Sequence, residues 1–449
     1  MAPLSKLQPR GMKGHSPLAY PPGRGLFQAL QLAVVGVAVG LACWPLNQMD
    51  RWQDGLLRHL PAFGGGWNTT TLGLALAPLW VMPLLLLLQA RLWPGGSGSG
   101  IPQTMACVED PDRSEVLMGP GPTVQRVVLW SIATLALFPL GREGPVVQVG
   151  AAALVAMRRH FPALLGWLGA PERLAIAGAA GLAAGFNTPL VSVLFLLEEF
   201  IGRVRPSLVW PAIVMASLAA LVSGRGGQPE FAFGILTLKV GEPIQMLWAV
   251  PFGLGAGLLG ALMALALLAI NSHLLPLARR RPLPLGIVLG GGLALLALAS
   301  DGAGCGDGEA LMAQVLREDS GAHFTPLALL ARLLGPGLAM GAAVPGGLID
   351  PALTLGALMG RMVGDPLGIG TLALALAMAA SMAGATQLPL LSFMFSLRLV
   401  GDQQLLPGVL LASVLGAGMG RVLMPCGVYH QLAAQLLPAQ PQPRSQGLR

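Results

Sequence analysis

Residues 141–150 read GREGPVVQVG, and residues 347–356 read GLIDPALTLG. Both fit the pattern G-x-x-x-P-x-x-x-x-G. A second pair follows in the same order: residues 189–195 (PLVSVLF) and residues 389–395 (PLLSFMF) share Pro-Leu, a serine and a final phenylalanine. The two pairs are offset by 206 and 200 residues. Two collinear matches predict a chain built from two related halves.

The sequence around these motifs carries little charge. Of its 449 residues 54% are hydrophobic and 10% are charged, whereas soluble domains carry about 25% charged residues. Five stretches without Asp, Glu, Lys or Arg each exceed the ~20 residues that a membrane-spanning helix needs: residues 25–49, 59–90, 174–197, 243–278 and 366–397. The composition excludes a soluble globule and predicts a helical protein that crosses the membrane many times.

The 62 glycines and 38 prolines predict an all-α fold with many short, tilted and broken helices. The uncharged runs beside Arg142-Glu143, residues 127–141 and 144–157, are each too short to span a bilayer. They indicate a helix pair that breaks at Gly141–Pro145. Duplicated halves with such breaks are typical of transporters with a binding site at the membrane midplane.

We interpret the net charge of +7 as a sign of how the chain is oriented in the membrane, and not as a sign of affinity for nucleic acid. Basic residues precede the first apolar run and occupy short loops: Lys6, Arg10, Lys13, Arg24, Arg203, Arg205 and Arg279–Arg281. By the positive-inside rule they face the cytoplasm. We expect a multi-pass protein of the inner (plasma) membrane with both termini in the cytoplasm.

The chain divides into a polar N-terminal segment (1–24), one membrane domain (25–437) and a short tail (438–449) that we expect to be disordered. The related halves span about residues 25–225 and 240–437. The cysteines lack paired spacing, the histidines lack metal-ligand spacing, and no Gly-Lys dipeptide occurs. We therefore expect no metal, no cofactor and no ATP-binding loop.

Three Gly/Pro segments, residues 98–102 (GSGIP), 141–145 and 347–351, each place proline where a helix can begin. Helix N-termini carry unpaired N–H groups and about half a positive charge, so several aimed at one point form an anion site. Partial charges bind an anion moderately, as conduction requires. The alternative is that each segment is a kinked packing motif. Because three such segments occur in a chain with two related halves, we favour the anion site.

Glu143 lies between two glycines in this low-charge region. A carboxylate inside the membrane is costly and indicates a function. Beside helix N-termini it can occupy an anion's place, and when protonated it loses that attraction and swings away. One residue can therefore gate an anion path and carry a proton. The alternative is an ion pair with Arg142.

Two further positions have open interpretations from the bare sequence. Glu198-Glu199 ends an uncharged run, where a glutamate pair is usually solvated but can serve as a second proton station. Tyr429 is one of two tyrosines. Its hydroxyl seeks a partner if it is buried, although packing in the core or at an interface is equally consistent with its position.

With these residues in view, the chain resembles the CLC family of chloride channels and proton-coupled chloride antiporters, over about residues 26–435. Residues 98–102 resemble the family's GSGIP element, in which Ser99 would coordinate the central anion. Residues 141–145 resemble its gating motif, with Glu143 as the external gate. The third segment is similar to the GxFxP element, whose amides fall on Leu348 and Ile349.

The resemblance also implies that Tyr429 coordinates the anion and that Glu199 is the internal proton-transfer residue. It implies an inverted-repeat fold, a homodimer with one pathway per subunit, and a chain without room for the cytoplasmic CBS domains of larger members. Two positions depart from the pattern. Ile349 replaces the family's phenylalanine, which should reshape the path. Asp350 precedes Pro351 and is expected to cap its own helix, or else to face the pore as a third titratable group.

These observations predict proton-coupled chloride antiport in a lipid bilayer, with chloride and protons as the transported partners. A passive chloride channel on the same fold is one alternative. An antiporter for fluoride or nitrate is another, although Ser99 favours chloride by resemblance. A membrane-embedded enzyme that uses Glu143 or the Glu198-Glu199 pair would need a nucleophile, metal cluster or cofactor motif, none of which the sequence offers. We therefore expect a transport protein and not an enzyme.

Overall fold

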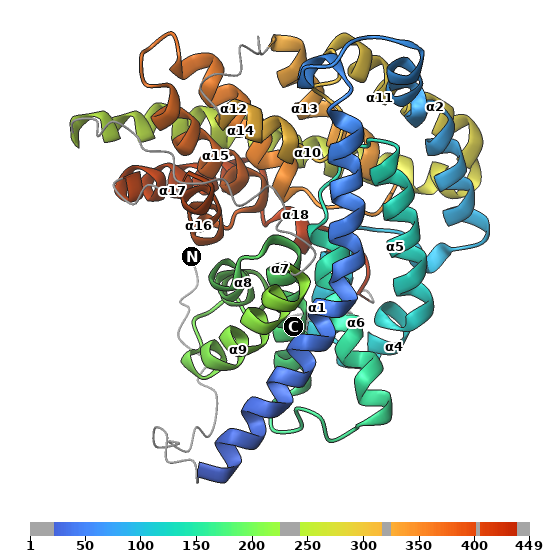
Figure 1. The fold of residues 1–449 in the computed structure, drawn as a ribbon, viewed down its shortest axis with the longest axis vertical. Helices are drawn as coiled ribbons and strands as arrows, with labels where there is room; N and C mark the ends of the chain where they lie inside the picture. Colours follow the sequence, from blue (N-terminus) through green and yellow to red (C-terminus); the bar gives the residue numbers. More distant parts are fainter. Residues whose placement is uncertain (1–21, 225–242, 317–324, 401–404, 438–449) are drawn as a thin grey trace, which may run out of the picture.

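The structure is a computed structural model that describes residues 22–224, 243–316, 325–400 and 405–437. The described chain is helical apart from one isolated β-bridge, which confirms the predicted all-α fold (Figure 1). The expected N-terminal segment lies almost entirely outside the described residues, and the expected tail lies wholly outside them.

Helices of the first half form one continuous series. Its members are α1 (Pro22–Leu57), α2 (Thr69–Arg91), α3 (Ile101–Glu109), α4 (Ser114–Met118), α5 (Pro120–Leu135), α6 (Glu143–His160), α7 (Ala170–Phe186), α8 (Pro189–Phe195), the π-helical turn η4 (Leu196–Phe200) and α9 (Pro206–Ser223). Short 3₁₀ turns occur at η1 (Pro61–Phe63), η2 (Pro94–Gly96) and η3 (Pro111–Arg113).

The second half repeats this order after a further 3₁₀ turn, η6 (Pro243–Trp248). Its members are α10 (Ala249–Arg280), α11 (Pro282–Ala299), α12 (Glu309–Leu316), α13 (Pro326–Met340), α14 (Ile349–Gly364), α15 (Gly370–Thr386), α16 (Pro389–Val400) and α17 (Leu406–Leu423). One further helix, α18 (Val428–Ala434), follows.

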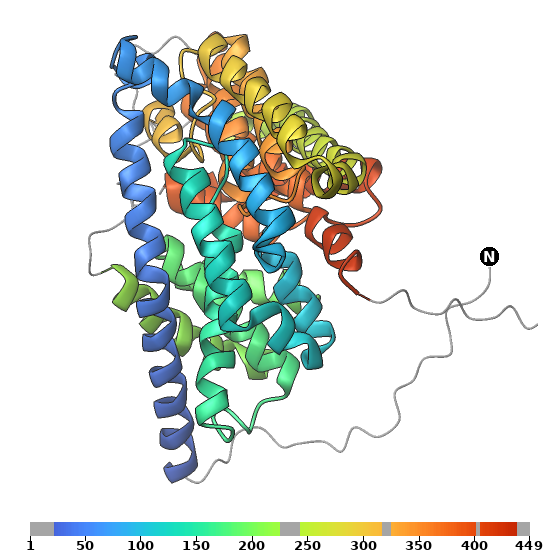
Figure 2. The same ribbon diagram turned by 90° about the vertical axis from the view of Figure 1, so that its right-hand side faces the viewer.

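Equivalent helices make equivalent contacts in the two halves. Helix α1 packs on α9 as α10 packs on α17, α6 packs on α7 as α14 packs on α15, and α7 packs on α9 as α15 packs on α17. Counterparts also touch across the halves, since α2 contacts α11 and α8 contacts α16. Figures 1 and 2 show α1 reaching from the group that holds α7–α9 to the group that holds α10–α17.

Helix breaks recur at matching positions. The uncharged run 174–197 holds most of α7 and all of α8, and the run 366–397 holds α15 and most of α16. The residue that ends the first helix of each pair, Asn187 or Gln387, has a positive φ, of 50° and 62° respectively. The predicted break at Gly141–Pro145 is confirmed, because α5 ends at Leu135 and α6 begins at Glu143.

The first glycines of the two quoted motifs meet each other. Gly141 N donates to Gly347 O at 3.0 Å, and Gly347 N donates to Gly141 O at 2.7 Å. This antiparallel bridge is the one isolated bridge of the described chain. An antiparallel meeting of equivalent residues fits two halves inserted in opposite orientations, so the starts of α6 and α14 are held side by side.

A buried arginine braces an equivalent loop in each half. Arg126 of α5 donates to three carbonyl groups of residues 95–98 at 2.7–3.0 Å. Arg332 of α13 donates to three carbonyl groups of residues 303–306 at 2.6–2.7 Å. Charged guanidinium groups therefore satisfy backbone oxygens that have no helical partner in the low-dielectric interior. These loops lead into α3 and α12.

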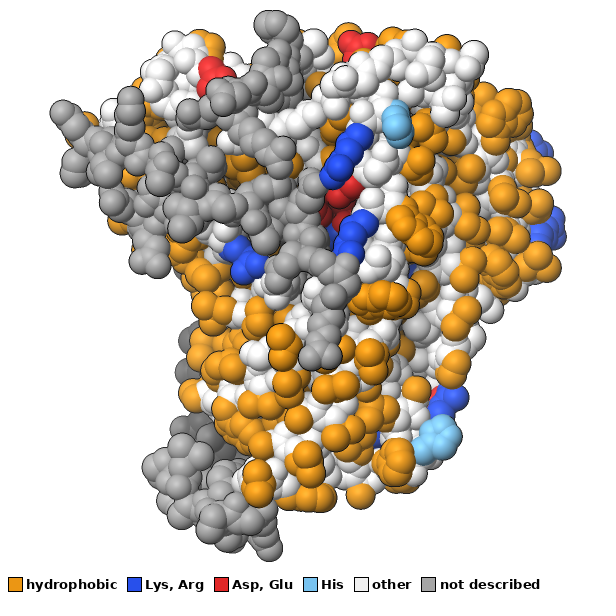
Figure 3. Space-filling view, viewed as in Figure 1, with side chains coloured by type: hydrophobic (Ala, Val, Ile, Leu, Met, Phe, Trp, Pro, Cys, Tyr) orange, Lys and Arg blue, Asp and Glu red, His pale blue; other side chains and the backbone are white. Residues whose placement is uncertain are grey.

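The outer surface is apolar. Six helices of the described chain are long and apolar enough to cross a membrane: Gly25–Leu57, Thr69–Arg91, Pro206–Ser223, Ile244–Arg280, Pro282–Ala299 and Leu406–Ala434. Large apolar side chains such as Trp80 (74% exposed) lie on this surface. Figure 3 shows hydrophobic side chains over much of one face and charged ones in small groups. Such a surface suits lipid and not water.

Candidate functional site

Glu143 is the first residue of α6, and its side chain is fully buried. Its Oε1 accepts a hydrogen bond from the backbone N–H of Asp350 at 2.5 Å. Asp350 lies in the first turn of α14, where backbone N–H groups have no partner within the helix. The carboxylate of one half therefore sits on the N-terminus of the equivalent helix of the other half, in a place that suits an anion.

Glycine is required around this carboxylate. A Cβ added at Gly347 or at Gly141 would overlap the carboxyl group of Glu143. A Cβ at Gly144 would overlap Ser99, whose backbone and hydroxyl oxygens lie against that glycine. The glycines of the two motifs thus let Glu143 fold back between the two halves, and they bring the loop before α3 to the start of α6.

Tyr429 closes another side of the site. The backbone N–H of Leu348 donates to the Tyr429 hydroxyl oxygen at 3.2 Å. Tyr429 is 1% exposed, and Leu348 and Ile349 are fully buried. Because the hydroxyl oxygen accepts this bond, its own proton remains available for an acceptor within the site.

Ser99 lies in the loop braced by Arg126, just before α3. It is 4% exposed, and its Oγ has no hydrogen-bond partner among the described residues. It also lines a cavity of about 100 Å³ together with Asn271 and Arg279 of α10 and Gln435 after α18. A buried hydroxyl group without a hydrogen-bond partner can donate to an acceptor that binds beside it.

The sequence-predicted residues Ser99, Glu143, Leu348, Ile349 and Tyr429 are thus neighbours in the structure. Contacts run from Ser99 to Gly144, from Glu143 to the start of α14, and from that helix start to Tyr429. Glu199 is not in this group, since it lies in η4 beside His430.

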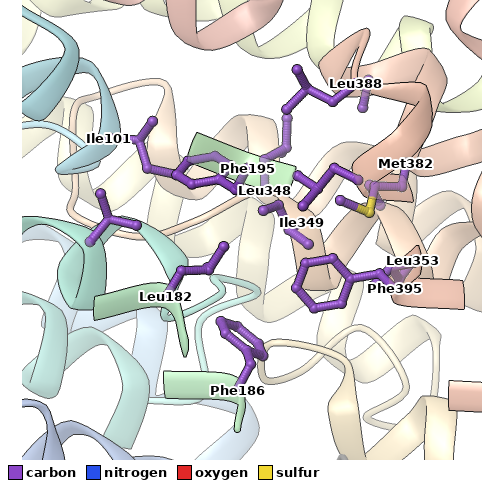
Figure 4. Packing of buried hydrophobic residues seen from close by; sticks show 14 of the residues in the cluster. Ile101, Leu182, Phe186, Phe195, Leu348, Ile349, Leu353, Met382, Leu388 and Phe395 are labelled. Atoms are coloured by element: carbon purple, nitrogen blue, oxygen red, sulfur yellow. The ribbon is translucent and has the colours of Figure 1, made fainter. Parts of the chain in front are cut away.

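Ile349 belongs to a buried apolar cluster that contains residues of both halves. Figure 4 shows Leu348 and Ile349 in the same part of this cluster as Phe195 and Phe395, with Phe186 nearby. The rings of Phe186 and Phe395 meet edge to face, with centroids 5.6 Å apart and planes at 88°. The position at which the sequence carries isoleucine, where the resembled motif has phenylalanine, therefore belongs to the same buried cluster as these aromatic rings.

The expected helix-capping role of Asp350 is wrong. Helix α14 begins at Ile349, its N-cap residue is Leu348, and no side chain caps it. Asp350 is already within the first turn and is fully buried, and neither carboxylate oxygen has a hydrogen-bond partner among the described residues. Its electrostatic neighbours are Glu143, Asp307, Arg142 and Glu309.

The alternative pairing of Arg142 with Glu143 is also wrong. Arg142 forms ion pairs with Asp50 of α1 and with Glu309 of α12, the second at 2.9 Å between Nη2 and Oε2. Its guanidinium carbon lies 4.6 Å from the centroid of the Phe186 ring. Arg142 therefore pairs with these two acids and not with Glu143, and it ties α1, α6, α7 and α12 together.

Three buried acids gather around Arg142. Carboxylate oxygens of Asp50, Asp307 and Glu309 lie within 4.8 Å of one another, an arrangement whose oxygen atoms resemble those of a hard-cation site. Arg142 supplies the positive charge there. We read this cluster as an ion-pair network and not as a metal site.

Glu198 and Glu199 lie in η4 and have different surroundings. Glu198 accepts the backbone N–H groups of Leu390 and Leu391 at 3.1 and 2.8 Å, so it caps α16 of the other half. The Glu199 carboxylate is 1% exposed and lies 3.4 Å from His430 Nδ1. A π-helical turn is uncommon and is frequent at functional sites, because it redirects successive side chains.

Two features of the site escaped the sequence analysis. His430 stands alone in the sequence beside Tyr429, and no spacing connects it with Glu199. Asp50, Asp307 and Glu309 are likewise far from Arg142 along the chain. The bracing pair Arg126 and Arg332 had a detectable signal, since the two are separated by the same 206 residues as the quoted motifs.

Comparison with known proteins agrees with this arrangement. The family model for voltage gated chloride channels matches residues 81–421. The voltage-gated ClC-type chloride channel ClcB of Shigella boydii serotype 18 is 28% identical over 307 residues, which cover 66% of this chain and 72% of that protein. ClcB of Escherichia coli O157:H7 is 28% identical over 305 residues, with the same coverage.

Solved structures show the same fold at low identity. A slow cyanobacterial Cl−/H+ antiporter matches with a TM-score of 0.73 and 20% identity, over 91% of this chain and 97% of that chain. A CLC-type fluoride/proton antiporter matches with a TM-score of 0.73 and 20% identity, over 91% of this chain and 98% of that chain. The family model covers most of the chain, and the inverted repeat is in place. This protein therefore belongs to the voltage-gated chloride channel (CLC) family of anion transporters.

Proposed function

We propose that this protein is a proton-coupled chloride antiporter in which Glu143 is the external gate. The observation that carries the proposal is the hydrogen bond from the Asp350 N–H to the Glu143 carboxylate, in a fully buried site at a helix start. A carboxylate held there occupies a place that an anion would take. Protonation removes its charge and its attraction to the helix N-terminus.

Coupling follows from competition for that place. An ionised Glu143 excludes chloride from the start of α14, and a protonated Glu143 leaves it to chloride. The inward part of the anion path would use the Ser99 hydroxyl, the Tyr429 hydroxyl and the amides of Leu348 and Ile349. The unpartnered Ser99 Oγ and the available Tyr429 proton support this assignment. Glu199 would exchange protons with Glu143 from the other side of Tyr429.

Basic residues support an assignment of the two ends of the proposed path to the two sides of the membrane. Arg203 and Arg421 line the cavity that Glu199 borders, and Arg279 lines the cavity that Ser99 borders. Basic residues in loops and at the ends of membrane helices face the cytoplasm by the positive-inside rule. We therefore assign the Glu199 side to the cytoplasm and the side of Asp307 and Glu309 to the exterior of a bacterial inner membrane. By family resemblance we also propose a homodimer with one pathway in each subunit.

A flux measurement tests the function. The protein is reconstituted in liposomes with a chloride gradient and a pH-reporting dye, and an ionophore clamps the voltage. We expect chloride to drive protons against their own gradient, and Glu143→Gln to abolish proton movement while chloride still flows. Chloride flux without proton movement in the unaltered protein would instead establish a channel.

A second anion is the specific rival, since one structural neighbour is a fluoride/proton antiporter. The same liposomes loaded with fluoride or nitrate separate the possibilities. The buried Ser99 hydroxyl favours chloride by resemblance, and faster proton exchange with fluoride than with chloride would overturn that choice. Light scattering of the purified protein, or cross-linking in the bilayer, tests the dimer.

A further inference from the structure

Glu199 is an internal acid with little direct access to water. Its side chain is 1% exposed, and neither carboxylate oxygen has a hydrogen-bond partner among the described residues. A buried carboxylate that takes part in proton transport must receive its protons from a neighbouring group that itself meets the solution. The neighbour in contact is the imidazole of His430, whose Nδ1 lies 3.4 Å from Glu199 Oε1.

His430 occupies a boundary position on α18. The preceding residue, Tyr429, is 1% exposed and faces the anion site, whereas the His430 side chain is 49% exposed. Successive residues of a helix point about 100° apart, so α18 presents the tyrosine inward and the histidine outward. One short helix thereby holds a group of the proposed anion path and a half-exposed imidazole side by side.

Two open cavities meet at this imidazole. One, of about 880 Å³, is lined by Glu109, Asp110 and Phe200 among others, and the second, of about 480 Å³, by Glu198, Arg203 and Arg421 among others. His430 and Glu199 line both of them. Either cavity is large enough to hold water beside the ring.

We infer that His430 is the proton shuttle between cytoplasmic water and Glu199. The inference rests on the proposed function, in which Glu199 is the inner proton acceptor. The imidazolium gives its Nδ1 proton to the Glu199 carboxylate, which becomes neutral as the ring becomes neutral. The ring then takes a proton from cavity water at the emptied Nδ1, and the same step repeats in reverse for outward release.

Charged groups face the ring from several of the elements around it. Glu199 comes from η4, and Glu109 at the end of α3 lines the first cavity together with the ring. Asp110 shares the first cavity, and Glu198, Arg203 and Arg421 share the second. Of the other helices packed on α18, α15 carries no charged residue, and Arg279 of α10 lines the separate Ser99 cavity.

The test compares His430→Gln with the unaltered protein in the liposome assay, across pH 5.5 to 8. Glutamine keeps a polar side chain but cannot carry a titrating proton. We expect chloride-driven proton flux to fall by about tenfold or more, chloride flux to persist with a raised chloride-to-proton ratio, and the remaining proton flux to lose its dependence on internal pH. Persistent chloride flux also shows that the variant is folded, and His430→Asn provides a second such variant.

Two controls separate this inference from the proposed function. His160→Gln removes an exposed histidine at the end of α6 that lines neither cavity, and it should leave both fluxes unchanged. Glu199→Gln should stop proton flux if Glu199 is the inner acceptor. If Glu199→Gln stops it and His430→Gln leaves rate, ratio and pH profile unchanged, the shuttle is refuted while the antiporter stands. If Glu199→Gln has no effect, both the inner acceptor and the shuttle fail.

Discussion

The loops before α3 and α12 occupy equivalent places in the two halves but carry different chemistry. Each is held by a buried arginine that binds three of its carbonyl groups, Arg126 in the first half and Arg332 in the second. At matching positions the first loop carries the neutral Ser99, whereas the second carries Asp307 among the acids around Arg142. The backbone is duplicated, and the side chains are not.

The starts of α6 and α14 show the same contrast. Gly141 and Gly347 pair with each other, so the two helix starts are fixed as counterparts. In the quoted motifs, Glu143 of the first half corresponds to Ile349 of the second. The first half supplies a carboxylate, and the second supplies an amide that binds it. A symmetric scaffold thus places two helix N-termini at one point, and the side chains decide which of them carries the carboxylate at this matched position.

The bracing arginines should give the largest loss of stability. Arg126→Met and Arg332→Met each leave three buried carbonyl groups without their charged donor. We expect each to cost about 3 kcal/mol or more, seen as a clearly lower midpoint of thermal unfolding in detergent. Arg159→Met, at an exposed arginine beside Glu115, should change the midpoint little. If only one of the two variants lowered the midpoint, the two braced loops would not contribute equally to stability.

Gly347→Ala should have the largest effect on coupling. The added methyl would overlap the carboxyl group of Glu143, so that side chain must leave the start of α14. We expect proton flux to fall by about tenfold or more, because a displaced group loses its reactive geometry, while chloride flux persists. Gly141→Ala should act in the same direction. Gly418→Ala in α17, where a Cβ meets nothing within 4 Å, is the matched control. Normal coupling in both bridge variants would contradict the proposed position of Glu143.

The local parts of this arrangement were predictable from sequence. The two motifs predict the repeat and the helix breaks, because each lies within a short Gly/Pro segment whose backbone consequences are local. The roles of Ser99, in the separate segment 98–102, and of Glu143 and Leu348 stay predictions. Asp350 was misjudged by a single position. Helix α14 begins at Ile349, so Asp350 lies inside the first turn and not before it.

Contacts between distant segments were not predictable in the same way. Arg142 pairs with Asp50 and Glu309, which belong to α1 and α12, and no spacing in one sequence fixes that choice. His430 meets Glu199 because the π-helical turn η4 directs two adjacent glutamates to different partners. Such a turn depends on tertiary packing more than on local propensity.

Ile349→Phe tests how the second half is packed at the position that corresponds to Glu143 of the first half. Ile349 is fully buried in the cluster that contains the Phe186 and Phe395 rings. A larger ring should overpack this space and cost about 1–3 kcal/mol. Adding Phe395→Leu should restore part of the loss, which a double-mutant cycle on thermal midpoints measures. An unchanged midpoint in the single variant would mean that the site holds spare volume and that the path is wider than a phenylalanine would leave it.

Asp350→Asn tests the difference between the halves with the smallest expected effect. Asp350 has no counterpart with a side chain in the first half, because Gly144 holds the matching position. No hydrogen bond holds the carboxylate oxygens of Asp350 among the described residues, so neutralisation should not lower stability. If Asp350 is ionised while chloride binds, its negative charge opposes the anion from within the same buried region. Removing it should then tighten chloride binding by about 1 kcal/mol, roughly fivefold, in a calorimetric titration of the solubilised protein. The exposed acid Asp301, changed to asparagine, serves as control. Unchanged affinity would mean that Asp350 is neutral whenever chloride is bound, and that α14 offers the anion its amides without a competing charge.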